Sequence, residues 1–155
     1  MKKLVVGALP LVIAGSYLIA VRAAPVDPVL YWNSVAIAEY VAATSPAPPG
    51  TPSPPPVRPG QVGFLDLAMV QVAVHDAVQA YDGRFEPYAV EITGASGSPV
   101  AAVAKAAHDV LVKLFPTQAA TLDAAYNDYL SKNGLAANNP GVAVGQIGDH
   151  HHVPG

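Results

Sequence analysis

The chain has 155 residues, of which 52% are hydrophobic and 12% charged, so the composition favours one domain with a buried core over a solvated disordered polymer. It contains no cysteine, which excludes disulfides, thiolate catalysis and Cys-ligated metals. The formal net charge is −3 and the few cations form no cluster, which argues against nucleic-acid binding.

Residues 1–23 have the pattern of a secretory signal peptide. Lys2 and Lys3 precede an apolar run that ends in small residues, so we expect cleavage after Ala23 and export to the periplasm or beyond the cell. The alternative is an uncleaved membrane anchor, because the run is about as long as a membrane span. Cleavage leaves five basic against eleven acidic residues, a formal charge of −6.

The segment 24–43 is predicted to contain the first helix, which runs to about Ala43. Asp27 before Pro28 is a typical helix start, since the carboxylate caps free N–H groups and proline lacks only a donor that has no partner there. Asn33 lies among apolar residues on one face, so its amide is expected to need partners. Residues 44–62 are rich in proline, which removes backbone donors, and they are predicted to form a semi-rigid spacer.

The next predicted helix, from Gly63 to Asp82, is the most apolar. Four polar residues, Gln71, His75, Gln79 and Asp82, share one narrow stripe and nearly everything else is apolar, so we expect it to be central and buried, and to end at a left-handed Gly83. Because few helices are available to cover it, we also expect self-association or packing against further helices.

Ser98-Pro99 repeats the cap-then-proline signal and begins a helix to Phe115, and a fourth helix is expected to end near Lys132. The charged residues of the helix after Ser98 line the face opposite its apolar one at i, i+4 spacing: Lys105, Asp109 and Lys113.

Asn139-Pro140 begins a fifth helix, whose pattern fails at Gly148. Residues 63–147 are therefore expected to form a helical bundle, as a partial domain, and residues 148–155 a disordered tail. The sequence predicts an all-α fold, a bundle of four to five helices with a Pro-rich spacer after the first.

Two His-Asp pairs, His75-Asp76 and His108-Asp109, are candidates for chemistry. If their helices pack side by side, His75 could meet Asp109, or His108 could meet Asp76, as a carboxylate-oriented imidazole or a metal pair. Neighbours on a helix point about 100° apart, so neither dipeptide is expected to converge by itself. The alternative is a core histidine on each helix, with an aspartate that faces solvent or caps a neighbour.

The tail contains four potential metal ligands, Asp149, His150, His151 and His152. Imidazoles so close together hold zinc, nickel or copper only on a fixed backbone, so we expect a loose, adventitious site there. The sequence has no phosphate loop, nucleophile elbow, HExxH motif or basic phosphate cradle, and no catalytic residue is assigned.

Four further pieces follow one another in a specific order: Trp32-Asn33, the stretch from Ala68-Met69 through His75-Asp76-Ala77 to Tyr81-Asp82, Phe85-Glu86-Pro87-Tyr88, and Ala107-His108 to Leu114-Phe115-Pro116. Together they resemble the N-terminal helical region of the bacterial vanadium-dependent haloperoxidase-like proteins of the type 2 phosphatidic acid phosphatase superfamily. The resemblance covers residues 27–147.

That resemblance implies an all-helical protein that holds vanadate or phosphate with a lysine, two arginines and a Ser-Gly-His turn. It also implies a histidine bonded to the vanadium or phosphorus. The three motifs that carry these residues are absent here, and Arg58-Pro59 matches only two letters within the spacer. No catalytic or cofactor-binding residue is carried over. The family pattern breaks soon after Gly145-Gln146, as in a truncated or frame-altered copy.

Two functions stay open. The first is an exported helical fragment of a haloperoxidase or acid-phosphatase-like protein, inactive alone, whose partner is a second copy or the missing catalytic half of the family fold. The alternative is a non-enzymatic exported module that binds a partner protein. Vanadate or phosphate is expected only in a full family member, and membrane contact only through an uncleaved signal segment.

Overall fold

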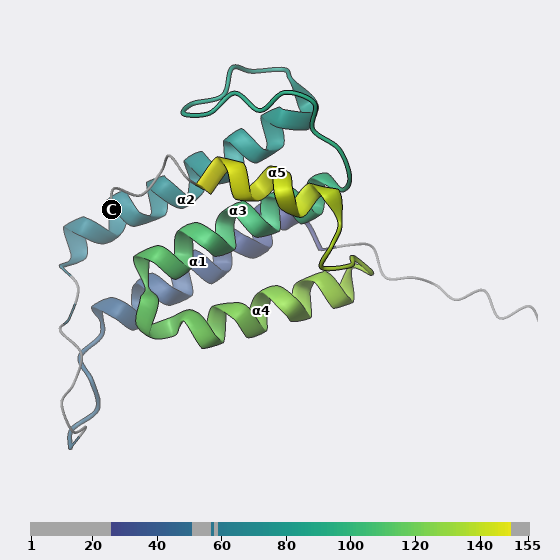
Figure 1. Cartoon of the computed structure of the whole chain (residues 1–155). Helices are drawn as coiled ribbons and strands as arrows, with labels where there is room; N and C mark the ends of the chain where they lie inside the picture. Colours follow the sequence, from purple (N-terminus) through teal and green to yellow (C-terminus); the bar gives the residue numbers. More distant parts are fainter. Residues whose placement is uncertain (1–25, 51–56, 58, 150–155) are drawn as a thin grey trace, which may run out of the picture.

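The computed structural model describes residues 26–50, 57 and 59–149, which form helices joined by loops (Figure 1). The elements are α1 (Pro28–Thr44), α2 (Gly60–Asp82), α3 (Pro99–Leu114), the 3₁₀ turn η1 (Pro116–Gln118), α4 (Ala119–Lys132) and α5 (Pro140–Asp149). The predicted all-α bundle is confirmed, and these described residues contain no β-strand. None of the described helices combines the length and the apolar character that crossing a membrane requires.

The helix ends follow local sequence signals. Asp27 caps α1 by accepting a hydrogen bond from the backbone N–H of Leu30 at 3.0 Å. Ser98 caps α3 in the same way through the N–H of Ala101 at 3.4 Å. Gly83 ends α2 in the left-handed conformation, with a φ of 61°, as predicted.

Two predicted boundaries are displaced. α2 begins at Gly60, inside the segment predicted as spacer, and α5 continues to Asp149, inside the predicted tail. α5 packs along α3, and this tertiary contact outweighs the poor helix propensity of its glycines. The signal segment 1–23 and residues 150–155 of the tail lie outside the described residues.

The central helix of the bundle is α3, so the prediction that α2 is the central helix is wrong. α3 packs against α1, α2, α4 and α5, and residues 101–104, 106–108, 110 and 111 are all buried. α2 is open to solvent at its start, where Phe64 and Leu65 are 70% and 64% exposed, whereas residues 69–81 are buried or half-buried. An alanine-rich helix suits the centre because its small side chains let several neighbours approach.

Two glycines allow α5 to lie close along α3. A Cβ atom at Gly141 would collide with the backbone oxygen of Ser98, and one at Gly145 with the backbone oxygen of Ala102. Backbone atoms cannot rotate aside as the end of a side chain can. The two glycines are four residues apart and share one face of α5, so any larger residue there would push the helices apart.

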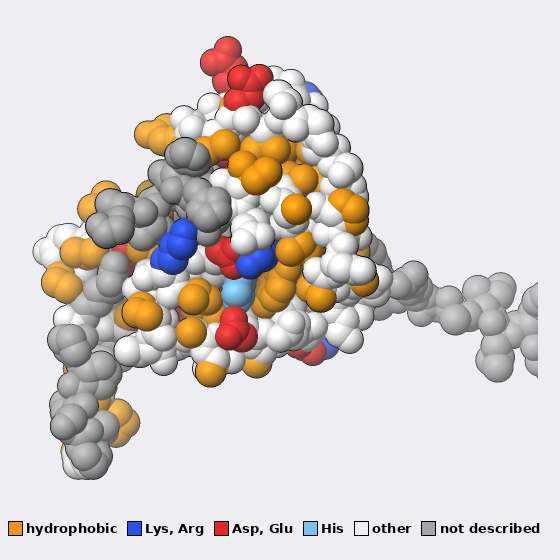
Figure 2. All heavy atoms as spheres, viewed as in Figure 1, with side chains coloured by type: hydrophobic (Ala, Val, Ile, Leu, Met, Phe, Trp, Pro, Cys, Tyr) orange, Lys and Arg blue, Asp and Glu red, His pale blue; other side chains and the backbone are white. Residues whose placement is uncertain are grey.

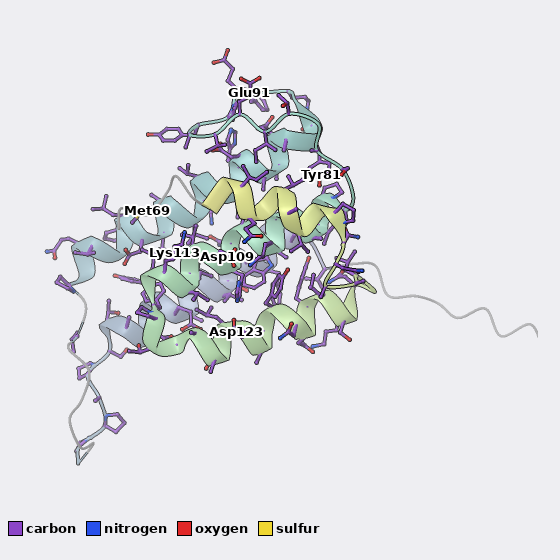
Figure 3. The ribbon with its side chains drawn as sticks, viewed as in Figure 1. Met69, Tyr81, Glu91, Asp109, Lys113 and Asp123 are labelled. Carbon is purple, nitrogen blue, oxygen red and sulfur yellow. The ribbon has the colours of Figure 1, made fainter. Side chains whose placement is uncertain are left out.

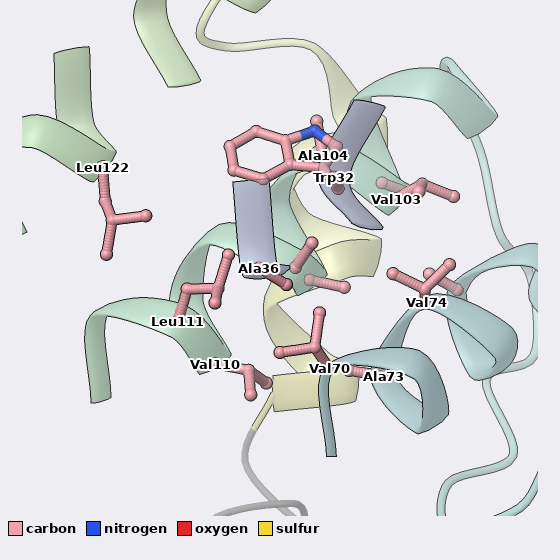
Figure 4. Packing of buried hydrophobic residues seen from close by; sticks show 14 of the residues in the cluster. Trp32, Ala36, Val70, Ala73, Val74, Val103, Ala104, Val110, Leu111 and Leu122 are labelled. Atoms are coloured by element: carbon pink, nitrogen blue, oxygen red, sulfur yellow. The ribbon is translucent and has the colours of Figure 1, made fainter. Parts of the chain in front are cut away.

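The hydrophobic core gathers around Trp32 of α1, the only tryptophan of the chain (Figure 4). Figure 4 shows Val70 and Val74 of α2 and Leu111 of α3 in the same cluster. Val70 and Val74 are 1% and 4% exposed. Self-association through α2 can therefore use only the opposite face of that helix.

Exposed apolar side chains lie where α1 ends and α2 begins. Ile37 and Val41 of α1 and Phe64 and Leu65 of α2 are all exposed, and Figure 2 shows apolar side chains at the start of α2, at the left of the view. The rings of Tyr40 and Phe64 lie 6.3 Å apart between centroids, which joins the two helices into one surface. We call Ile37, Val41, Phe64 and Leu65 the α1–α2 apolar surface.

Candidate functional site

A cluster of charged side chains lies where α3 faces α4. His108 of α3 is buried, with its Nδ1 2.7 Å from Oδ1 of Asp109 and its Nε2 2.8 Å from Oδ1 of Asp123 on α4. Lys105 donates from Nζ to the same Asp109 oxygen at 2.6 Å. Figure 3 labels Asp109 and Asp123 on these two facing helices. We call Lys105, His108, Asp109 and Asp123 the His108 cluster.

The geometry of the His108 cluster pairs two carboxylates with two nitrogen bases. An imidazole donates to a carboxylate at each ring nitrogen only when both nitrogens carry a proton. Burial alone raises the pKa of Asp109, but hydrogen bonds from His108 and Lys105 outweigh it and bring that pKa below its ordinary value. The charged groups thus offset part of the cost of their own burial.

Aromatic rings close one side of the cluster. The ring of Tyr126 lies 4.7 Å from that of His108 and the ring of Trp32 lies 6.4 Å from it, measured between centroids. Burial, with a smaller contribution from Asp109, raises the pKa of Tyr126 to about 12, so the phenol stays neutral near pH 7. Within the described residues, the Tyr126 hydroxyl and the Trp32 indole N–H have no hydrogen-bond partner. This apolar wall strengthens the neighbouring ion pairs by excluding water.

The His108 cluster joins α3 to α4. Both ring nitrogens of His108 are engaged, so Nε2 could act as a base only after Asp123, whose side chain is 59% exposed, moved away. In the part of the chain that the structure describes, no group of three His, Cys, Asp or Glu side chains is placed to hold a metal ion. With the groups present, the His108 cluster cross-links α3 and α4.

The first dipeptide, His75-Asp76, has a different task. Asp76 is 1% exposed, and its carboxylate accepts hydrogen bonds from three successive backbone N–H groups. These belong to Tyr88 at 2.6 Å, Ala89 at 2.9 Å and Val90 at 3.0 Å. A carboxylate satisfied in this way fixes the loop after α2 without any secondary structure in the loop itself.

Two more side chains of α2 hold the same loop, residues 83–97. Nε2 of His75 lies 3.1 Å from the carbonyl oxygen of Glu86, and Oε1 of Gln79 accepts the backbone N–H of Phe85 at 2.8 Å. The polar stripe that the sequence showed on α2 therefore supplies partners for loop backbone groups that would otherwise lack them.

The cross-pairing that the sequence left open between the two dipeptides is not formed. α2 and α3 do pack together, but His75 and Asp76 bind the loop, whereas His108 contacts Asp109 and Asp123. His108-Asp109 also converges within itself, because the imidazole ring turns its Nδ1 back to the neighbouring carboxylate. Neither aspartate faces solvent, since Asp76 is 1% exposed and the Asp109 side chain 13%.

The charged face of α3 is largely covered at two of its three positions. The side chains of Lys105 and Asp109 are 19% and 13% exposed, because α4 and α5 pack on this side of α3. Lys113 is exposed.

The candidate metal ligands His150, His151 and His152 lie outside the described residues, and Asp149 is the last residue of α5. Comparisons of the chain with protein-family models, with curated proteins and with solved structures find no match.

Proposed function

We propose that this chain is an exported helical scaffold, the N-terminal part of a vanadium-dependent haloperoxidase or acid-phosphatase-like protein, without catalytic activity of its own. The α1–α2 apolar surface carries the proposal. Its four side chains are between 45% and 70% exposed, and full burial of one such side chain contributes roughly 1.5 to 3 kcal/mol. The occupant that suits this surface is the set of helices that completes the family fold.

The distribution of cations supports the lack of activity. A vanadate or phosphate oxyanion needs several converging cations, and beyond residue 23 the sequence contains only two arginines, Arg58 and Arg84. Arg84 donates to Asp82 at 2.7 Å, and Lys105 is engaged with Asp109. In the full protein, the oxyanion would be held by residues outside the motifs found here.

The tasks of the motif residues also support a scaffold. Within the stretches that resemble the family, Asp76 and Gln79 fix a loop, and His108 links α3 to α4. Trp32 lies at the centre of the core. These are tasks of a framework that positions other helices.

Sedimentation of the purified chain tests the proposal. Without its partner helices, the α1–α2 apolar surface is expected to pair with a second copy, so the chain should form reversible dimers or larger species. Phe64→Ser combined with Leu65→Ser should yield a monomer. Phe85→Ser, a matched change of an exposed aromatic residue in the loop, should leave association unchanged. Halide oxidation with vanadate and peroxide, and phosphatase activity, should stay at background.

Other outcomes would contradict the proposal. A compact monomer that unfolds cooperatively and binds no hydrophobic dye would favour the alternative, a free-standing module that binds a partner protein. Vanadate-dependent turnover that survives purification would show that the family assignment is wrong. Export is checked by intact mass, where we expect a chain beginning at Ala24, and an uncleaved membrane-bound form would contradict it.

A further inference from the structure

The loop of residues 83–97 presents two exposed aromatic side chains on a firmly held backbone. Phe85 is 67% and Tyr88 80% exposed. The backbone N–H groups of these same two residues are bound by Gln79 and Asp76 of α2. Because the backbone beneath both rings is already fixed, a partner that binds them loses little conformational entropy in the loop.

The far end of the loop is tied to the same helix. The hydroxyl of Tyr81 donates to the carbonyl oxygen of Ser96 at 2.8 Å. Figure 3 labels Tyr81 near the end of α2 and Glu91 on the loop above it. Both arms of the loop are therefore anchored, and the surface between them has a defined shape.

A hollow of about 520 Å³ lies between the loop and the end of α2. Its lining combines apolar and acidic side chains: Phe85, Val90, Ile92, Glu86 and Glu91. Arg84 also lines the hollow, but its Nε donates to Asp82 at 2.7 Å. An apolar wall beside carboxylates suits a long cationic side chain, whose stem packs on the wall while its head meets the acidic groups.

We propose that this hollow and its exposed aromatic residues are a docking site for a protein segment that inserts an arginine or lysine side chain. The carboxylates of Glu86 and Glu91 supply charge complementarity, and the ring of Phe85 supplies a face for the cation. Tyr88, beside the hollow, is a residue type enriched among the dominant contacts of interfaces. The site lies at the opposite end of α2 from the α1–α2 apolar surface and does not depend on the scaffold proposal.

Fluorescence anisotropy with the full chain tests this site. The probe is a labelled peptide of three Gly-Ser-Tyr-Arg repeats, and two matched peptides carry glutamine or glutamate in place of arginine. We expect saturable binding of the arginine peptide, at least about fivefold weaker binding of the glutamine peptide and no binding of the glutamate peptide.

Variants locate the binding. Phe85→Ala, and separately Glu86→Gln with Glu91→Gln, should each weaken binding of the arginine peptide about fivefold or more. The matched controls are Phe64→Ala at the other end of α2 and Asp128→Asn on α4, which remove an exposed ring and an exposed carboxylate elsewhere. They should change binding less than about twofold. Thermal unfolding, monitored by circular dichroism, verifies that each variant is folded.

Three results of the peptide experiments would overturn the proposal. These are equal binding of the three peptides, no saturable binding below about 1 mM, and equal losses in the site variants and the controls. Loss of self-association in Phe85→Ala would identify a second copy as the occupant and would also overturn it. Failure of the scaffold proposal is read separately, from the variants of Phe64 and Leu65.

Discussion

His75-Asp76 and His108-Asp109 are the same dipeptide on two helices of one bundle, yet they differ in which member is buried deeper and in what that member binds. Asp76 is almost fully buried and binds a loop, while His108 is buried and binds across to α4. Neighbours on a helix point about 100° apart, so the orientation of the helix selects the buried member. The element that faces each dipeptide therefore determines which of its members makes the contact. A loop with free N–H groups is bound by a carboxylate, and a helix that carries Asp123 is bound by a donor.

Asp76→Asn should weaken the contact between α2 and its loop, and we expect it to have the largest effect on stability. Asparagine keeps the shape but turns an NH₂ group toward backbone donors, so at least one of the three N–H groups loses its acceptor. We expect the free energy of unfolding to fall by about 3 kcal/mol in urea denaturation, with faster hydrogen exchange at residues 88–90. Asp82→Asn, on the surface of the same helix, should cost less than about 0.5 kcal/mol, and equal costs would show that other contacts hold the loop.

His108→Ala should remove the contact between α3 and α4 that His108 makes, with a somewhat smaller effect on stability. The change removes both contacts to carboxylates and leaves a void against Tyr126, so we expect a loss of about 2 to 3 kcal/mol in the free energy of unfolding. Urea denaturation measures it. Asp123→Asn keeps the buried ring and should cost only about 1 kcal/mol. If the two variants were equally stable, the buried ring would contribute nothing beyond its contact with α4.

Low pH should weaken the ion pairs of Asp109, because its carboxylate becomes protonated. Because its folded-state pKa is lowered, its contribution to stability is fully present above its unfolded pKa of about 3.9 and is lost as pH falls through the folded value. The difference in unfolding free energy between the wild-type chain and Asp109→Asn should therefore shrink between neutral pH and about pH 3. A difference that stays constant over this range would contradict the ion-pair account.

His75→Ala should reduce stability least of these variants, which would distinguish His75 from His108. His75 contributes one contact, to the carbonyl oxygen of Glu86, and Asp76 and Gln79 continue to hold the loop. We expect a loss of about 0.5 to 1 kcal/mol in urea denaturation. A loss as large as that of His108→Ala would remove the distinction between the two histidines.

The helix ends could be predicted from the sequence because a cap depends on a few neighbouring residues. Asp27, Ser98 and Gly83 act as their local patterns indicate. The partner expected for Asn33 is also present, since its Oδ1 accepts a hydrogen bond from Nε2 of Gln71 at 2.8 Å. Such predictions need only short-range geometry or the burial of a polar group.

The centre of the bundle could not be ranked from hydropathy. α2 and α3 are about equally apolar, and the central position depends on how closely neighbours can approach. The signal for close packing was the spacing of Gly141 and Gly145, which places two bare backbone positions on one face of α5. Asp123 was missed because its contact with His108 depends on how the turn at η1 folds α4 back along α3.

Trp32 is an intrinsic fluorescence probe of this protein. It is the only indole in the chain, it is fully buried, and the rings of Tyr31 and Tyr129 lie 5.4 and 6.0 Å away between centroids. Tyrosines so close pass their excitation to the indole. The wavelength of the tryptophan emission therefore reports whether α1 is packed in the core, without any added dye.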